Sequence, residues 1–169
     1  TLKLRFKHDG KISDRKDVTF GIRKISYVIT NAVGSTNPML VIYVNGRRIL
    51  ILGGNWGMAE GMLNCDAAGY ALRVRLHHDA NLNMIRNWVG MVGDEAFYDA
   101  CDRYGILIWD DFWLANPHDG PDPTDQKMFM ANARDKIRRI RGHPSLALYC
   151  GRNEGMPPKG LDKALPAAV

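Results

Sequence analysis

Two patterns of apolar positions divide the chain. Residues 1 to about 30 alternate polar and apolar side chains, as in TLKLRFK and DVTFGIRKISYVIT, which is typical of antiparallel strands with one face on a core. The segment MLVIYVNGRRILILGG then holds two apolar runs that are joined by Asn45 and Gly46. Both of these residues tolerate a positive φ, so the sequence predicts a β-hairpin at this point.

From Ile49 onward, short apolar segments of strand length alternate with helical stretches. One helix is marked by Asp94 as its N-cap and by Gly105 just past its end. This alternation predicts parallel strands with crossover helices, in either an open doubly wound sheet or a (β/α)8 barrel. The expected strands are ILILGGNW, NMIRNW, ILIWDDFW and LALYCGRNE, and the expected helices lie near 66–80, 94–104 and 125–141.

Polar or aromatic groups stand at the end of each of these four strands. A barrel builds its site from the carboxyl ends of many strands, whereas an open sheet concentrates its ligand groups at one switch point. The stretch GGNWG does not lead directly into a helix and has no Lys-Ser/Thr, so nucleotide binding ranks last. The groups are Asn55 and Trp56, then Arg86, Asn87 and Trp88, then Asp110, Asp111 and Trp113, and finally Asn153 and Glu154.

Tryptophans beside carboxylates, amides and an arginine fit a sugar, because its ring faces stack on indole while its hydroxyls take hydrogen bonds. Cleavage of a glycosidic bond needs one carboxylic acid for the leaving oxygen and a second carboxylate to attack or to activate water, so Glu154 is the candidate acid. The same residues can also have purely structural roles. A lone glutamate after a strand is commonly a surface charge and a tryptophan is commonly core, and we expect Trp109 in the core, opposite Asp110.

Composition and charge narrow the partners. The 169 residues are 46% apolar and 24% charged, as in globular proteins, and no apolar run approaches the roughly 20 residues of a bilayer helix. The net charge of +5 is spread along the chain, and its densest group, between Lys136 and Arg141, is interpreted as the solvated face of one helix. No membrane or nucleic acid partner is therefore expected. The three cysteines, Cys65, Cys101 and Cys150, are expected to be buried thiols.

Several motifs in order resemble glycoside hydrolase family 2, in its β-mannosidase and endo-β-mannosidase branch. They are FGIRKI, VNGRRILILGGNW, LNMIRNW, FYDACDRYGILIWDDFW and HPSLALYCGRNE, over about residues 18 to 160. The tail NEGMPPKGLDKAL is similar to that of plant-type mannosylglycoprotein endo-β-mannosidases. The resemblance implies that residues 42–169 are the first half of a (β/α)8 TIM barrel, strands one to four, and that residues 1–41 are the last strands of an immunoglobulin-like β-sandwich.

The resemblance also implies roles for individual residues. Glu154 would be the acid/base of a retaining mechanism, Asn153 would bind the sugar at C2, and Arg86 would position the nucleophile and stabilise its charge. Trp88 and Asp111 would line the subsite for the non-reducing sugar. The strand-end residues Asn55, Trp56 and Trp113 complete the predicted substrate-binding set.

Two departures bear on activity. The family's RxWGGG is RNWVGMVG here, with Val89 and Met91 in place of glycines, which leaves substrate choice open. The chain holds three glutamates, Glu60, Glu95 and Glu154, and in this family the nucleophile is a Glu at the end of the seventh strand. We therefore expect half a catalytic pair, a chain that is inactive alone, and open strand edges that need the remainder of the barrel.

Two classes of function stay open at this stage. One is a hydrolase of β-mannosides or related β-glycosides, with exo-β-glucosaminidase and β-galactosidase as alternatives within the family. The other is a non-catalytic carbohydrate-binding module that uses the same tryptophans and Asp111. The expected partner is an oligosaccharide or β-glycoside, with no cofactor and no metal, since His77 and His78 face different ways in a helix. The opening at Thr1 suggests a piece of a longer polypeptide, and the resemblance fits a periplasmic or secreted enzyme.

Overall fold

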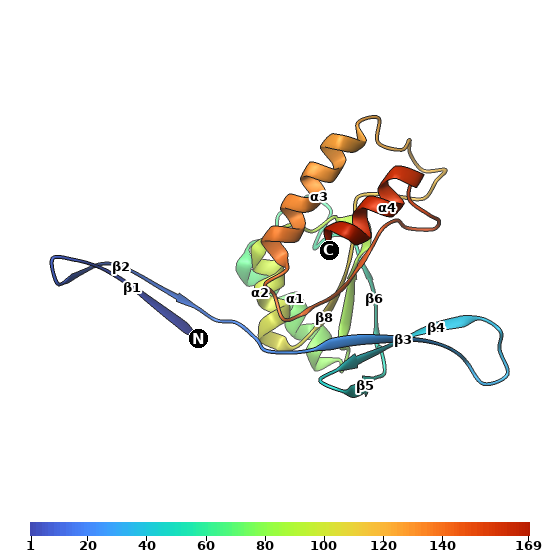
Figure 1. Cartoon of the computed structure of the whole chain (residues 1–169). Coiled ribbons are helices and arrows are strands. Elements are labelled where there is room, and N and C mark those ends of the chain that lie inside the picture. Colours follow the sequence, from blue (N-terminus) through green and yellow to red (C-terminus); the bar gives the residue numbers. More distant parts are fainter.

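The computed structural model describes residues 1–169 and shows a parallel sheet flanked by helices, with antiparallel strands projecting from it (Figure 1). The four parallel strands pair in the order β6-β7-β8-β9, so the predicted alternation of strands and crossover helices is confirmed. The strands are β6 (Gly53–Trp56), β7 (Met84–Asn87), β8 (Leu107–Asp111) and β9 (Leu146–Cys150). The helices are α1 (Ala67–Asp79), α2 (Glu95–Tyr104), α3 (Gln126–Ile140) and α4 (Lys159–Ala168).

Local capping chemistry explains where the helices begin and end. At the start of α1 the carboxylate of Asp66 accepts a hydrogen bond from the backbone N–H of Gly69 at 2.7 Å. Asp94 is the N-cap of α2 as predicted, but its carboxylate accepts from the Tyr70 hydroxyl at 2.5 Å and so ties α2 to α1. Gly105 ends α2 with φ 70°, the left-handed conformation in which glycine costs least.

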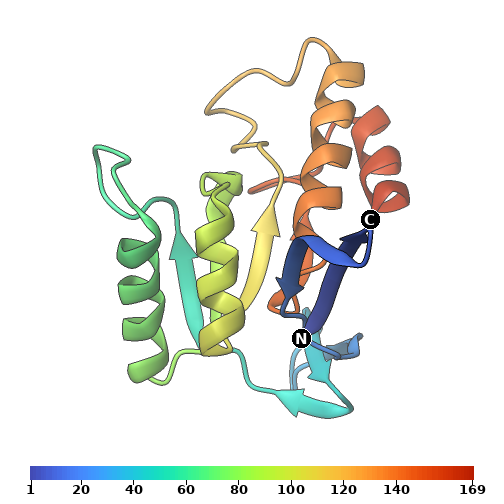
Figure 2. The same ribbon diagram turned by 90° about the vertical axis from the view of Figure 1, so that its left-hand side faces the viewer.

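One face of the sheet is sealed by helices. Ile85 of β7 and Ile108 of β8 are fully buried against Val74 of α1 and Phe97 of α2, in a core cluster of 12 buried residues. Figure 2 shows β6 and β8 running in the same direction beside these helices. A second core cluster joins α3 to α4, and none of the helices has the length and apolarity that crossing a bilayer requires.

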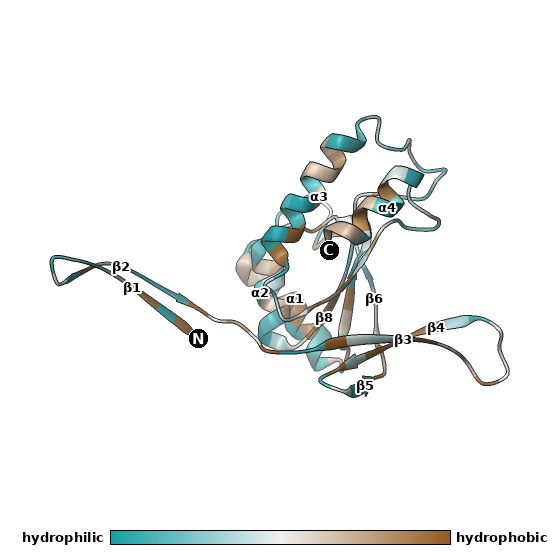
Figure 3. Ribbon diagram, viewed as in Figure 1, coloured by the Kyte–Doolittle hydropathy of each residue, from teal (hydrophilic) through white to brown (hydrophobic).

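The N-terminal strands form two antiparallel units. β1 (Leu2–His8) and β2 (Lys11–Val18) make a hairpin that extends away from the body (Figure 1). Its apolar and polar positions alternate as predicted (Figure 3), but the expectation that one face packs on a core is wrong in this structure. Leu2, Phe6 and Ile12 stay about half exposed, because two strands alone have nothing to pack against.

The second unit consists of β3 (Ile25–Asn31), β4 (Pro38–Val44) and β5 (Arg47–Ile49). The predicted hairpin is confirmed, with φ of 51° at Asn45 and 78° at Gly46 between β4 and β5. Arg23, just before β3, donates to the carbonyl oxygens of Pro144 and Leu146 at 3.0 and 2.6 Å, which attaches this unit beside β9. β4 runs through the proposed boundary at residue 41, and the half-barrel and immunoglobulin-like assignments stay predictions.

Ile85→Ala should lower the free energy of unfolding by about 2 to 5 kcal/mol, because it opens a cavity in the fully buried core between the sheet and α2. Chemical denaturation followed by circular dichroism measures the change. The control is Ile22→Ala, whose side chain is 88% exposed and should change stability by no more than about 0.5 kcal/mol. Equal effects of the two substitutions would contradict this core.

Candidate active site

Three of the predicted site residues meet at the carboxyl ends of successive strands. The guanidinium of Arg86, on β7, donates two hydrogen bonds to the carboxylate of Asp111, on β8. Nε lies 3.1 Å from Oδ1 and Nη2 lies 2.7 Å from Oδ2. The same Nη2 donates to Oδ1 of Asn153, after β9, at 2.9 Å. The Arg86 guanidinium also lies 5.0 Å from the centroid of the Trp109 ring. Asp111 is fully buried, so this two-point ion pair fixes the direction of the arginine.

The loop after β7 is held by the same carboxylate. The backbone N–H of Val89 donates to Asp111 Oδ2 at 3.1 Å. Val89 has φ 45° and Gly90 has φ 63°, so two successive residues are left-handed. A Cβ at Gly90 would lie 2.6 Å from the carbonyl oxygen of Asp111, which only glycine avoids. Val89 thus adopts the backbone conformation that favours glycine, at a cost on the order of 1 to 2 kcal/mol.

The segment after β9 places an amide inside and a carboxylate outside. Asn153 is buried, and its Nδ2 donates to Oδ1 of Asn116 in the loop after β8. Its neighbour Arg152 donates to the carbonyl of Ala115 at 3.0 Å and pairs with Asp122 at 2.7 Å, which anchors that loop. Glu154 is exposed, and its φ of 48° turns the chain sharply away from the strand. Its carboxylate makes no hydrogen bond within the protein and remains free for a ligand.

The predicted aromatic residues divide between two faces of the sheet. Trp56 lies on the helical face, stacked 5.7 Å from His77 and edge-on to Phe97, so the structure does not bring it to the Arg86 group. Its Nε1 donates to the carbonyl of Met58. Trp113 is 42% exposed in the loop after β8. Asn55 is exposed, Trp88 is half-buried, and Trp109 lies half-buried beneath Arg86 on the face opposite Asp110.

A second buried ion pair lies behind the first. Lys136, on α3, pairs with Asp110 and donates to the carbonyl of Asp111 at 2.8 Å. Tyr98 and Asn87 also donate to Asp110, at 2.6 and 3.3 Å. Burial and the charge of Asp110 raise the pKa of Tyr98, so its hydroxyl stays protonated and donates. The interpretation of Lys136 as part of a solvated helix face is therefore wrong.

The sequence held a signal for this lysine. The apolar stripe of α3 includes Ala133, Ile137 and Ile140, and Lys136 stands three residues after the first and four before the last. At helical spacing that position faces the core. A lysine at a core-facing position needs a buried anion as its partner. Asp110 and Asp111 are two adjacent carboxylates, and Arg86 can neutralise only one of them, so the other was a candidate partner for Lys136.

At the strand ends the buried carboxylates of Asp110 and Asp111 are paired with Lys136 and Arg86. A cavity of about 710 Å³ lies along the open edge of β9. Its walls include Arg23, Tyr27, Phe112, Met156 and Leu165. About half of the residues that line the cavity are apolar. The cavity adjoins the turn that contains Glu154.

Lys136→Met should cost about 3 to 5 kcal/mol of stability, because Asp110 would remain as an uncompensated buried charge. Arg138→Met, at an exposed position on the same helix, should change stability by no more than about 0.5 kcal/mol. Urea unfolding of both variants measures the difference. Adding Asp110→Asn to Lys136→Met should recover part of the loss, and a double variant as unstable as the sum of both single changes would refute the pairing.

Known proteins match this chain in both sequence and fold, although no family model matches the sequence. It is 39% identical over 162 residues to a mannosylglycoprotein endo-β-mannosidase of Lilium longiflorum, and the match covers 90% of this chain and 17% of the lily protein. The chain spans less than a fifth of the length of the curated relatives it matches.

Solved structures agree with these relatives. A β-D-mannosidase from Dictyoglomus thermophilum superposes with a TM-score of 0.69 at 30% identity, over 85% of this chain and 17% of that one. A glycosyl hydrolase family 2 member from Bacteroides cellulosilyticus gives a TM-score of 0.68 at 22% identity, over 88% of this chain and 19% of that one. In sequence and in fold the chain is therefore similar to β-mannosidases and to a solved member of glycosyl hydrolase family 2, over less than a fifth of their length.

Proposed function

We propose that this chain contributes the acid/base half of the active site of a retaining β-glycosidase that acts on β-mannosides. The observation that carries the proposal is the convergence of Arg86, Asp111 and Asn153 from three successive strands, immediately before the exposed carboxylate of Glu154. The names of the curated relatives, endo-β-mannosidase and β-mannosidase, favour mannose over glucosamine or galactose as the sugar.

In the proposed mechanism Glu154 donates its proton to the leaving glycosidic oxygen and then, as a carboxylate, removes a proton from the attacking water. Its free carboxylate at the end of β9 suits a group that must reach a substrate. The adjacent Asn153 keeps one amide hydrogen after its bond to Asn116, and that hydrogen is available to the sugar hydroxyl at C2. Both groups thus act from one strand end.

In this proposal Arg86 positions the carboxylate nucleophile and stabilises its charge. Its Nε and Nη2 are used by Asp111 and Asn153, while its Nη1 makes no hydrogen bond within the protein. The guanidinium is fixed by these two partners, so its unused Nη1 can donate hydrogen bonds to a carboxylate on a later strand. The Asp111 side chain is fully buried and both of its oxygens accept hydrogen bonds from Arg86, so in this proposal it positions Arg86 and the backbone of Val89.

The nucleophile and the rest of the barrel are proposed to come from outside these 169 residues. The open edge of β9, the cavity beside it and the half-covered inner face of the sheet support a sheet that continues with a further strand. Residues proposed to line the sugar subsites are Asn55, Trp88 and Trp113, whereas the packing of Trp56 between α1 and α2 removes it from this set. The chain alone is proposed to be inactive.

Glu154→Gln in the complete protein should lower turnover of a natural β-mannoside by about 10² to 10⁴-fold, because the amide cannot protonate the leaving oxygen. An aryl β-mannoside with an activated leaving group needs no protonation, so its first step should be largely preserved. Steady-state and burst kinetics on both substrates measure this difference.

The control is Glu60→Gln, the same chemical change at a side chain that accepts hydrogen bonds only from backbone N–H groups in the loop after β6. Parallel assays with β-glucosaminide and β-galactoside test the choice of sugar. Unchanged turnover in Glu154→Gln would remove this residue from catalysis, and sugar binding without cleavage of any substrate would favour a carbohydrate-binding module.

A further inference from the structure

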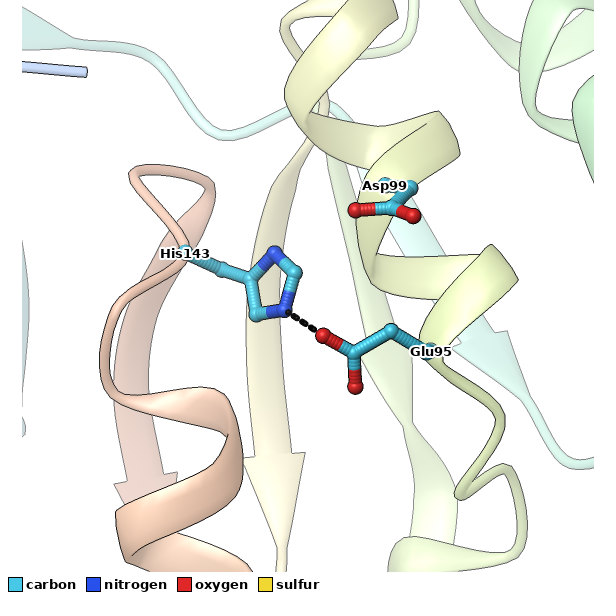
Figure 4. Close-up of side chains that lie close together, drawn as sticks. All are labelled: Glu95, Asp99 and His143. Carbon is cyan, nitrogen blue, oxygen red and sulfur yellow. Dashed lines mark hydrogen bonds and ion pairs between the residues drawn. The ribbon is translucent and has the colours of Figure 1, made fainter. Parts of the chain in front are cut away.

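A separate cluster of titratable side chains lies on the helical side of the sheet. Glu95 and Asp99 are one helical turn apart on α2, and His143 comes from the turn between α3 and β9 (Figure 4). A nitrogen of His143 and one carboxylate oxygen of each acidic residue all lie within 4.8 Å of one another. None of these residues contacts Arg86, Asn153 or Glu154, so the cluster is independent of the proposed sugar site.

The ring of His143 is held in one orientation from behind. Its Nδ1 is 2.7 Å from Asp102, whose other carboxylate oxygen accepts the backbone N–H of Ser145 at 2.9 Å. The ring is nearly buried and packs against Tyr98 with centroids 5.3 Å apart. These contacts aim Nε2 at Glu95, 3.0 Å away. A carboxylate on one ring nitrogen, with the other nitrogen directed at acidic groups, is the usual arrangement of a metal-binding histidine.

An ion pair explains only part of this arrangement. The hydrogen bond that the His143 ring donates to Asp102 is the largest of the effects that raise the pKa of His143, and a protonated ring would donate to both Asp102 and Glu95. Asp99 is left over. Its carboxylate is turned toward His143 (Figure 4) yet makes no hydrogen bond or ion pair. Asp99 and Glu95 are both exposed, so water screens part of the repulsion between their carboxylates, and a bound cation would remove the rest.

We propose that Glu95, Asp99 and His143 bind one divalent transition-metal ion of the Zn²⁺ class, with Asp102 holding the histidine ring from outside the ligand set. One imidazole nitrogen and two carboxylate oxygens are a ligand set that Zn²⁺ accepts, with water as a fourth ligand. The imidazole favours such an ion over Mg²⁺ or Ca²⁺, which prefer oxygen ligands alone. The ion would cross-link α2 to the turn that leads into β9, so it would stabilise the fold.

The test is isothermal titration calorimetry of the 169-residue chain with ZnCl2, and with MgCl2 for comparison, in a buffer that does not bind metal. We expect one Zn²⁺ per chain, and an affinity for Mg²⁺ at least about tenfold weaker. Asp99→Asn should weaken Zn²⁺ binding by about tenfold or more, and Asp102→Asn by about 10 to 100-fold. Because Asp99 makes no contact that the fold needs, its variant should melt at the wild-type temperature without metal and lose the rise in melting temperature that Zn²⁺ causes.

The matched control is His78→Asn. His78 is an exposed histidine on α1 that lies 3.2 Å from Asp79, outside the cluster, and its substitution should leave Zn²⁺ binding unchanged. The proposal is overturned if the wild-type chain binds no Zn²⁺, if Asp99→Asn binds it as tightly as wild type, or if His78→Asn removes the binding. In each of these cases the cluster is an ion pair of Asp102, His143 and Glu95, with Asp99 as a surface charge.

Discussion

The adjacent carboxylates of Asp110 and Asp111, at the end of β8, determine which charged side chains must lie at the neighbouring strand ends. Successive strand residues point to opposite faces of a sheet, so Asp110 faces the helices and Asp111 faces the other side. Both are fully buried, and a buried carboxylate without a partner is strongly unfavourable. Each face therefore needs its own cation. Lys136 of α3 supplies one and Arg86 of β7 supplies the other.

The two ion pairs connect segments that are distant in sequence. Lys136 also reaches the carbonyl of Asp111, and Arg86 extends to Asn153 beyond β9, so three strand ends and one helix are joined by charged groups. Asn87 closes the loop after β7 by exchanging two hydrogen bonds with Val92, at 2.8 and 3.0 Å. Polar groups on rigid strands, held by a second layer of contacts, are the arrangement that a preorganised site requires.

Much of the framework was predictable because its signals are local. Asn45-Gly46 requires two left-handed residues, Asp94 and Gly105 mark the ends of a helix, and the apolar segments have strand length. The meeting of Arg86, Asp111 and Asn153 also followed from their places at the ends of parallel strands. These inferences depend on short-range geometry and on the common direction of the strands, both of which can be read along the chain.

The sequence by itself determined the order of strands and helices, the turns and the identity of the polar groups at each strand end, because those depend on backbone preferences and on period. Only the tertiary structure decided which face each group serves. It turned Trp56 into the helical layer and placed His143 among Glu95, Asp99 and Asp102. Such pairings depend on how helices pack across the sheet and on which buried charges must be neutralised, and neither is encoded in neighbouring residues.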